Sequence, residues 1–196
     1  MILYIHGFNS SASSHKARLL FTQMKRLGLE NEIIIPCLSP YPDDAISELK
    51  KLAEQQLANK LVFIGSSLGG YYATWLAEHY QRPAVLINPA VKPYELLRDY
   101  IGHNVNHYTG EEYYLATEHI AQLRSLDIDK ISKPERFMLM LQTGDEVLDY
   151  TQARDKFAGS QMILETGGDH GFAGFEKQFD ALLGFCGIDQ PLKHSY

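Results

Sequence analysis

The segment of this chain best suited to chemistry is Gly-Ser-Ser-Leu-Gly at residues 65–69. The apolar run 60–64 before it predicts a buried strand, and the run 68–80 after it predicts a helix. A Gly-x-Ser-x-Gly at such a junction is typical of a nucleophile elbow, a sharp turn that holds one hydroxyl above the sheet. Side chains two residues before and after that serine would clash, which explains the glycines. We therefore predict Ser67 as a nucleophile.

A serine hydroxyl needs a base to remove its proton, and His170 is the best placed of the eight histidines. It lies in a loop of small residues, 167–172, after the strand-like run 160–164. A loop in that position can carry an imidazole across the C-terminal edge of the sheet. The other candidates are less suitable. His79 is too far along the helix that follows Ser67, and His194 is in a polar tail. His15 and His119 lie in amphipathic stretches. His103 and His107 are four residues apart, but the residues around them argue against the helix that a metal-binding pair would need.

The acid that orients the base is expected after the strand before the histidine's strand. Residues 136–142 predict that strand and Asp145 follows it, so we predict Asp145 as the acid. Glu146 is adjacent and stays open as an alternative. Asp149 is better explained as a helix cap, because with Gln152 it resembles a capping box that opens a helix over 150–157.

Two backbone N–H groups are expected to form an oxyanion hole. One is that of Leu68, directly after the nucleophile, and the other should come from a loop after an early strand. Residues 2–5 predict this strand, Gly7 permits a tight turn, and the N–H of Phe8 is the natural second donor. His6 is expected to make structural hydrogen bonds beneath this loop.

Alternating strands and helices must position these residues. The expected strands are 2–5, 32–36, 61–65, 84–88, 136–142 and 160–164. The expected helices are 14–27, 43–58, 68–80, 150–157 and 171–186. This alternation predicts an α/β protein with a parallel sheet covered on both faces.

The order serine, acid, histidine is the chain order of the α/β-hydrolase triad. The segments 2–11, 65–70, 142–150 and 167–175 resemble the small single-domain bacterial esterases called YqiA-like, over nearly the whole chain to about residue 188. The resemblance implies a minimal α/β-hydrolase fold, with about six mostly parallel strands in the order 2-1-3-4-5-6. It also implies esterase activity on acyl esters, thioesters such as acyl-CoA included, with Ser67, Asp145 and His170 as the triad.

One segment, residues 90–134, is long for a connection and falls where hydrolases insert a cap. It is rich in tyrosine and leucine, and two helices are expected near 92–101 and 111–124, separated by the Gly/Asn-rich stretch 102–110. We interpret it as a small helical lid that shapes an acyl pocket, with the pocket residues unassigned. The alternative is a helical pair that only packs on the core. The chain would then be one domain, 1–188, followed by a flexible tail, 189–196.

Composition agrees with a compact enzyme. Of the 196 residues 45% are hydrophobic and 21% charged, and the net charge of −6 argues against a nucleic-acid or anionic-membrane surface. No apolar run is long enough for a membrane helix. The first expected strand follows Met1 at once, so no signal peptide is expected. Cys37 and Cys186 form no metal motif. We therefore expect a cytoplasmic enzyme that needs no metal or organic cofactor.

The function expected from these residues is hydrolysis of carboxylic esters or thioesters through an acyl-enzyme on Ser67. Two alternatives stay open. An acyltransferase would use the same triad but admit an alcohol or thiol in place of water. A non-catalytic binding protein could share the fold, although it would not need all three groups of the triad. The only partner expected is the small-molecule acyl substrate, and the oligomeric state is left open.

Overall fold

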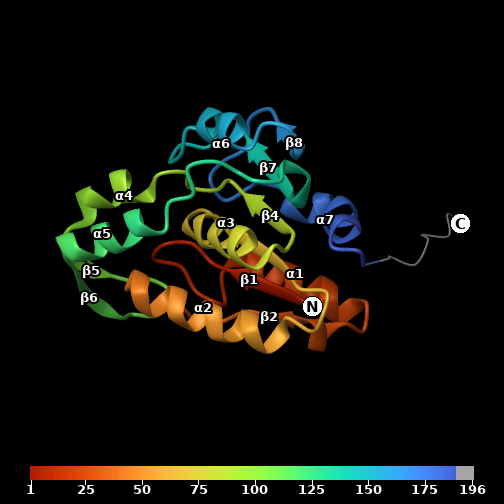
Figure 1. The fold of residues 1–196 in the computed structure, drawn as a ribbon, viewed down its shortest axis with the longest axis horizontal. Helices are drawn as coiled ribbons and strands as arrows, with labels where there is room; N and C mark the ends of the chain where they lie inside the picture. Colours follow the sequence, from red (N-terminus) through yellow and green to blue (C-terminus); the bar gives the residue numbers. More distant parts are fainter. Residues whose placement is uncertain (189–196) are drawn as a thin grey trace, which may run out of the picture.

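One six-stranded parallel sheet organises the computed structural model, which describes residues 1–188 (Figure 1). Its strands are β1 (Ile2–Ile5), β2 (Ile33–Ile34), β3 (Val62–Ser66), β4 (Ala84–Ile87), β7 (Phe137–Gln142) and β8 (Gln161–Glu165). Their order is β2-β1-β3-β4-β7-β8, and every neighbouring pair is parallel. The predicted order is confirmed, because β5 and β6 belong to a separate hairpin.

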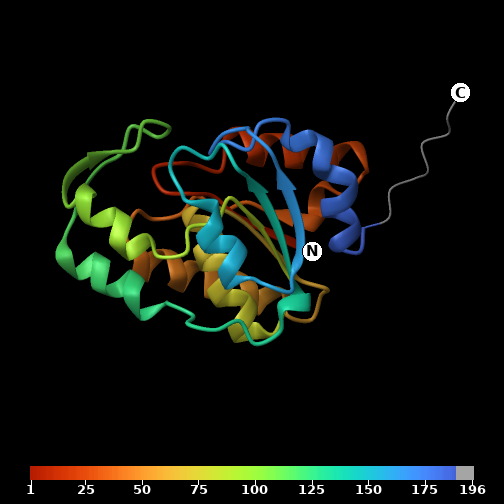
Figure 2. The same ribbon diagram turned by 90° about the horizontal axis from the view of Figure 1, so that it is seen from above.

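Helices cover both faces of this sheet. On one face lie α1 (His15–Arg26) and α7 (Phe179–Phe185), which lie together in Figure 2. On the other face lie α2 (Pro42–Gln56), α3 (Leu68–Tyr80) and α6 (Tyr150–Lys156). Short 3-10 turns precede β2, β7 and α7: η1 (Glu30–Glu32), η3 (Pro134–Arg136) and η4 (Phe175–Gln178).

The last helix is shorter than predicted. Residues 171–174 form a loop in which Phe172 and Gly174 both have positive φ, 61° and 75°. This backbone conformation cannot continue a right-handed helix, so the expected start at 171 was wrong. The loop keeps the preceding residue, His170, outside the helix.

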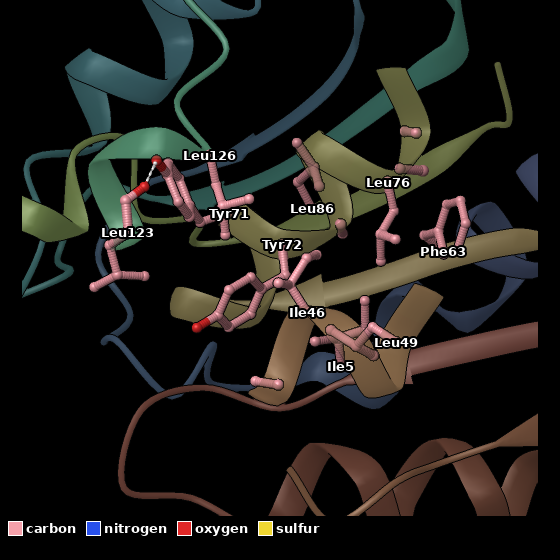
Figure 3. Close-up of a cluster of buried hydrophobic side chains, with 14 of the residues drawn as sticks. Ile5, Ile46, Leu49, Phe63, Tyr71, Tyr72, Leu76, Leu86, Leu123 and Leu126 are labelled. Atoms are coloured by element: carbon pink, nitrogen blue, oxygen red, sulfur yellow. Dashed lines mark hydrogen bonds between the residues drawn. The ribbon is translucent and has the colours of Figure 1, made fainter. Parts of the chain in front are cut away.

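The core lies on both faces of the sheet, because successive strand residues point to opposite sides. In β7, Phe137, Leu139 and Leu141 join the α2/α3 side, while Met138 and Met140 join the α1/α7 side. Figure 3 shows part of the α2/α3 side, where Phe63, Leu76 and Leu86 pack together with residues of α2. This packing fixes the strands whose C-terminal ends carry the candidate site.

The inserted segment 90–134 contains a β-hairpin as well as helices. It runs through α4 (Pro93–Leu96), η2 (Leu97–Tyr100), β5 (Gly102–Val105), β6 (Glu112–Leu115) and α5 (Thr117–Ser125). The helix predicted over 111–124 was therefore wrong for its first part. Burial alternates along β6, with Tyr113 and Leu115 buried and Glu112 and Tyr114 exposed, which is the two-residue period of a strand. We call the segment the lid segment below.

The lid segment is anchored on the loop between β1 and α1. The Tyr113 hydroxyl donates to Asn9 Oδ1 at 2.6 Å, and the Asn106 amide donates to the Ser10 carbonyl at 2.9 Å. On its other side, the hydroxyl of Tyr71 on α3 donates to the Leu123 carbonyl at 2.7 Å, drawn as a dashed line in Figure 3. These contacts join the hairpin to the β1 loop and α5 to α3, and the lid segment lies at one end of the molecule (Figure 1).

Candidate active site

The Gly-x-Ser-x-Gly segment forms a strained turn between β3 and α3. Ser67 has φ 56° and ψ −122°, a conformation that non-glycine residues rarely adopt and that costs about 1–3 kcal/mol. A Cβ on Gly65 would overlap the backbone of Gly69 and Gly70, and one on Gly69 would overlap the Ile5 carbonyl. The predicted clash within the turn is confirmed for Gly65, whereas the nearest obstacle to a side chain at Gly69 is the backbone of β1. The turn leaves the Ser67 side chain facing solvent-accessible space.

Three side chains from separate loops form one hydrogen-bonded chain. Ser67 Oγ lies 3.0 Å from His170 Nε2, and His170 Nδ1 lies 2.9 Å from both Asp145 Oδ1 and Oδ2. An ionised carboxylate only accepts, so Nδ1 carries the proton in this arrangement. Nε2 is then left as an acceptor for the Ser67 hydroxyl. The structure thus brings together the three residues predicted as a triad.

Asp145 is held in its ionised form. Its side chain is 1% exposed, and Oδ1 also accepts the N–H groups of Val147 and Leu148 at 2.9 Å each. Burial by itself raises the pKa of this carboxyl, but the hydrogen bonds from His170, Leu148 and Val147 outweigh it and hold the pKa below its usual value. A permanent negative charge therefore faces the imidazole.

The two neighbouring acids have other contacts. Glu146 accepts the backbone N–H of His170 at 3.0 Å, so it contacts the main chain of that residue and not its ring. This bond lowers the pKa of Glu146. Asp149 caps α6 as predicted, accepting the N–H of Thr151 at 2.9 Å. Of the three acids in this loop, only Asp145 contacts the imidazole of His170.

Sequence reasoning missed two residues that anchor the His170 loop. The Asn88 amide donates to the carbonyls of Asp169 and His170 at 3.0 and 3.3 Å, and its oxygen accepts the N–H of Gln142. Gln142 Oε1 accepts the N–H groups of Asp169 and Ala173 at 3.1 and 2.9 Å. Both residues are polar and buried at the ends of apolar strands, a signal that could have identified them.

The predicted oxyanion-hole donors, Phe8 and Leu68, line the same cavity as Ser67. A Cβ on Gly7 would come within 3.1 Å of Ser67 Cβ, so the β1 loop passes close to the nucleophile elbow. Within residues 1–188, neither the N–H of Phe8 nor that of Leu68 has a hydrogen-bond acceptor, which leaves both free to bind an oxygen.

His6 has the structural role predicted for it. Its Nδ1–H donates to the Gly7 carbonyl at 2.9 Å, and its Nε2 accepts the N–H of Leu38 at 3.2 Å. Burial lowers the pKa of His6, which favours the neutral ring that this pattern requires. The histidine thereby supports the loop that carries Phe8.

Two cavities reach Ser67 and His170 from different sides. The apolar cavity, about 400 Å³, is lined mainly by the lid segment and the loop after β7: Ala90, Pro93, Leu96, Leu97, Tyr100, Val147 and Leu148. The polar cavity, about 280 Å³, is lined by the β1 loop and the start of α1: Gly7, Ser10, Ser14, His15 and Lys16, with Tyr108 at the hairpin turn. The lid segment thus supplies much of the apolar wall.

Across residues 1–188, no three or more His, Cys, Asp or Glu side chains are grouped so that they could hold a metal ion. Over the same range, no helix has both the length and the apolar character needed to cross a membrane.

The fold is that of the α/β hydrolases. A putative hydrolase from Agrobacterium vitis superposes with a TM-score of 0.71 at 16% identity, covering 94% of this chain and 87% of that one. The mouse alpha/beta hydrolase domain-containing protein 10 gives a TM-score of 0.70 at 17% identity, covering 93% and 89%. Est1E from Butyrivibrio proteoclasticus, solved with ferulic acid bound, gives 0.68 at 11% identity, covering 94% and 86%. At these identities the similarity establishes the fold.

The chain belongs to the family described as "Uncharacterised protein family (UPF0227)", whose profile matches residues 1–187. A UPF0227 protein of Citrobacter koseri is 22% identical over 192 residues, covering 94% of this chain and 98% of that protein. The predicted resemblance to the YqiA-like family is thereby confirmed.

Proposed function

We propose that this protein is a serine hydrolase of carboxylic esters, thioesters included, and that Ser67, His170 and Asp145 are its catalytic residues. The observation that carries the proposal is the hydrogen-bonded chain from Ser67 Oγ through His170 to Asp145. The chain ends at a hydroxyl that opens onto two cavities. The esterase domain of a Rhodothermus marinus protein, which shares the fold, supports the same reaction class.

The geometry suits acyl transfer to Ser67. His170 Nε2 removes the hydroxyl proton as Ser67 Oγ attacks the carbonyl carbon, and the charge on the carbonyl oxygen is stabilised by the N–H groups of Phe8 and Leu68. The tetrahedral intermediate collapses, and His170 returns the proton to the leaving oxygen or sulfur. A water molecule, deprotonated by His170, then attacks the carbonyl carbon of the acyl-enzyme. The second tetrahedral intermediate collapses, the acid is released, and His170 returns the proton to Ser67 Oγ. Asp145 keeps the imidazole in the required tautomer and stabilises its cation.

The proposal is tested by Ser67→Ala. This change removes one oxygen at a turn and no core contact, so the protein should fold with an unchanged melting curve. Triad substitutions of this kind lower the rate by about 10⁴–10⁶, so hydrolysis of a p-nitrophenyl ester should fall to near background. A fluorophosphonate probe should label the wild type on Ser67 and leave the variant unlabelled.

Ser125→Ala is the matched control, because Ser125 lies on α5 and its hydroxyl only donates to the Gln122 carbonyl. It should keep wild-type turnover and labelling. Near wild-type turnover by Ser67→Ala would disprove the proposal. Two results would favour the alternatives. If an alcohol or thiol is added and its ester or thioester is the main product, the protein is an acyltransferase. If the wild type shows neither labelling nor turnover, it is a binding protein.

A further inference from the structure

Lys16 contributes a cation to the wall of the polar cavity. Lys16, in the first turn of α1, is partly buried, and its ammonium group donates to the Gly171 carbonyl at 2.9 Å. In the part of the chain that the structure describes, this carbonyl is its only hydrogen-bond acceptor and Lys16 forms no ion pair. An ammonium group has three donors, so two remain free. The cation and these two free donors are therefore available to a ligand in the polar cavity.

The surroundings of Lys16 also favour an anion. The first turn of α1 contains no acidic residue, and the N-cap residue Ser14 makes no side-chain capping bond. The positive end of this twelve-residue helix therefore remains uncompensated on the side of the cavity. Ser10 and Ser14 add hydroxyl groups to the same wall. Burial lowers the pKa of Lys16, and the charges of Asp169 and Asp145 oppose that shift.

The two cavities differ in charge. Among the described residues that line the apolar cavity, Asp99 is the one carboxylate and no lysine or arginine is present. An anion would be repelled there, whereas hydrocarbon would be well accommodated. The larger, apolar cavity is therefore suited to the acyl group, and the polar cavity to the other half of the substrate.

Lys16 also lies close to the base, which must protonate the leaving half of the substrate. Lys16 is bonded to the carbonyl of Gly171, the residue directly after His170. In the reaction proposed above, His170 donates its proton to the leaving group, which must therefore depart on the side of the base. We propose that the polar cavity binds a leaving alcohol or thiol that carries a negative charge, and that Lys16 is the residue that recognises this charge. This inference rests on the proposed ester hydrolysis and names the substrate class that the site prefers.

The test compares two esters with one acyl group: the butyrates of 4-hydroxybenzoate, whose leaving group is anionic, and of 4-hydroxybenzamide, whose leaving group is neutral. In Lys16→Gln, kcat/KM for the anionic ester should fall about tenfold or more, which is typical of losing a charge-assisted hydrogen bond. The neutral ester should change less than about twofold. Lys16→Arg should retain most of the preference. Lys25→Gln, an equal charge change at an exposed site on α1, should leave both esters unaffected.

Three outcomes would overturn the inference. Equal losses on both esters would mean that Lys16 acts only through Gly171 on the position of His170. A Lys16-dependent preference for an anionic acyl group, measured with the hemisuccinate of 4-hydroxybenzamide, would place the charge on the wrong half of the substrate. No loss on any ester would mean that Lys16 recognises nothing. The proposed function is judged separately, because it requires only that the wild type hydrolyses the neutral ester and that Ser67→Ala does not.

Discussion

Adjacent carboxylates in the loop after β7 have different roles because of where their oxygens point. The side chain of Asp145 is almost fully buried and contacts the imidazole of His170 with both oxygens. Glu146 is exposed and contacts only the backbone N–H of the same residue. The sequence predicts Asp145 but leaves Glu146 open as the acid, since the two residues are adjacent and lie closer together than the reach of a side chain. Geometry assigns the imidazole contact to Asp145.

The different contacts of Asp145 and Glu146 predict that substituting them will lower the rate of hydrolysis unequally. Asp145→Asn should lower kcat/KM about 10⁴-fold, because an amide stabilises no imidazolium and favours the wrong tautomer. Glu146→Gln should lower it only a few-fold, because the amide oxygen of glutamine can still accept the His170 N–H. Steady-state kinetics on one activated ester measures both. Comparable losses in the two variants would contradict the assignment.

At the scale of elements, the lid segment combines a structural part and a part that lines the apolar cavity. Its five tyrosines divide accordingly. Tyr94 and Tyr113 are buried and donate to Asp127 and Asn9. Tyr100 lines the apolar cavity and packs edge-on against Phe8, with ring centroids 5.2 Å apart. Tyr108 lines the polar cavity, and Tyr114 contacts His103 on the hairpin and lines neither cavity. The lid interpretation therefore predicts a substrate effect mainly for Tyr100.

Tyr100→Ala should reduce the preference for long over short acyl chains. Burial is worth roughly 0.8 kcal/mol per methylene, so each methylene that loses its contact should lower the ratio of kcat/KM values about fourfold. Tyr114→Ala is a matched control, because the two side chains are 49% and 50% exposed. The measurement is kcat/KM for p-nitrophenyl esters of graded length. An unchanged ratio in Tyr100→Ala, with the fold intact, would remove the support for an acyl-binding lid.

At the scale of the whole molecule, stability comes from a sheet that is buried on both faces. Leu86, in the central strand β4, is fully buried beneath α3, whereas Leu164, in the edge strand β8, is 46% exposed. Leu86→Ala should therefore lower the free energy of unfolding by about 2–5 kcal/mol, because a cavity remains in the core. Leu164→Ala should cost under about 1 kcal/mol. Urea unfolding followed by circular dichroism measures both, and equal losses would contradict this account of the core.

Features that depend on neighbouring residues could be predicted from the sequence alone. The nucleophile elbow follows from local sterics, because a side chain at residue 65 would overlap the backbone of residues 69 and 70 once the strand turns into a helix. The six strands each contain a short apolar run. Their parallel direction follows from the alternation with helices, and their order from the family resemblance. The helix cap at Asp149 is likewise set within three residues. Each of these signals lies within one short segment.

Only the tertiary structure decided the rest, because it depends on contacts between distant segments. The hairpin in the lid segment is too short to be stable alone and depends on contacts such as that of Tyr113 with Asn9, 104 residues away. The loop of His170 is positioned by Asn88, 82 residues earlier, which no local pattern indicates. The two cavities likewise form only where the β1 loop, α1, the lid segment and the loop after β7 meet. Local sterics and periodicity act within a few residues, whereas the shape and charge of a binding site arise from packing between them.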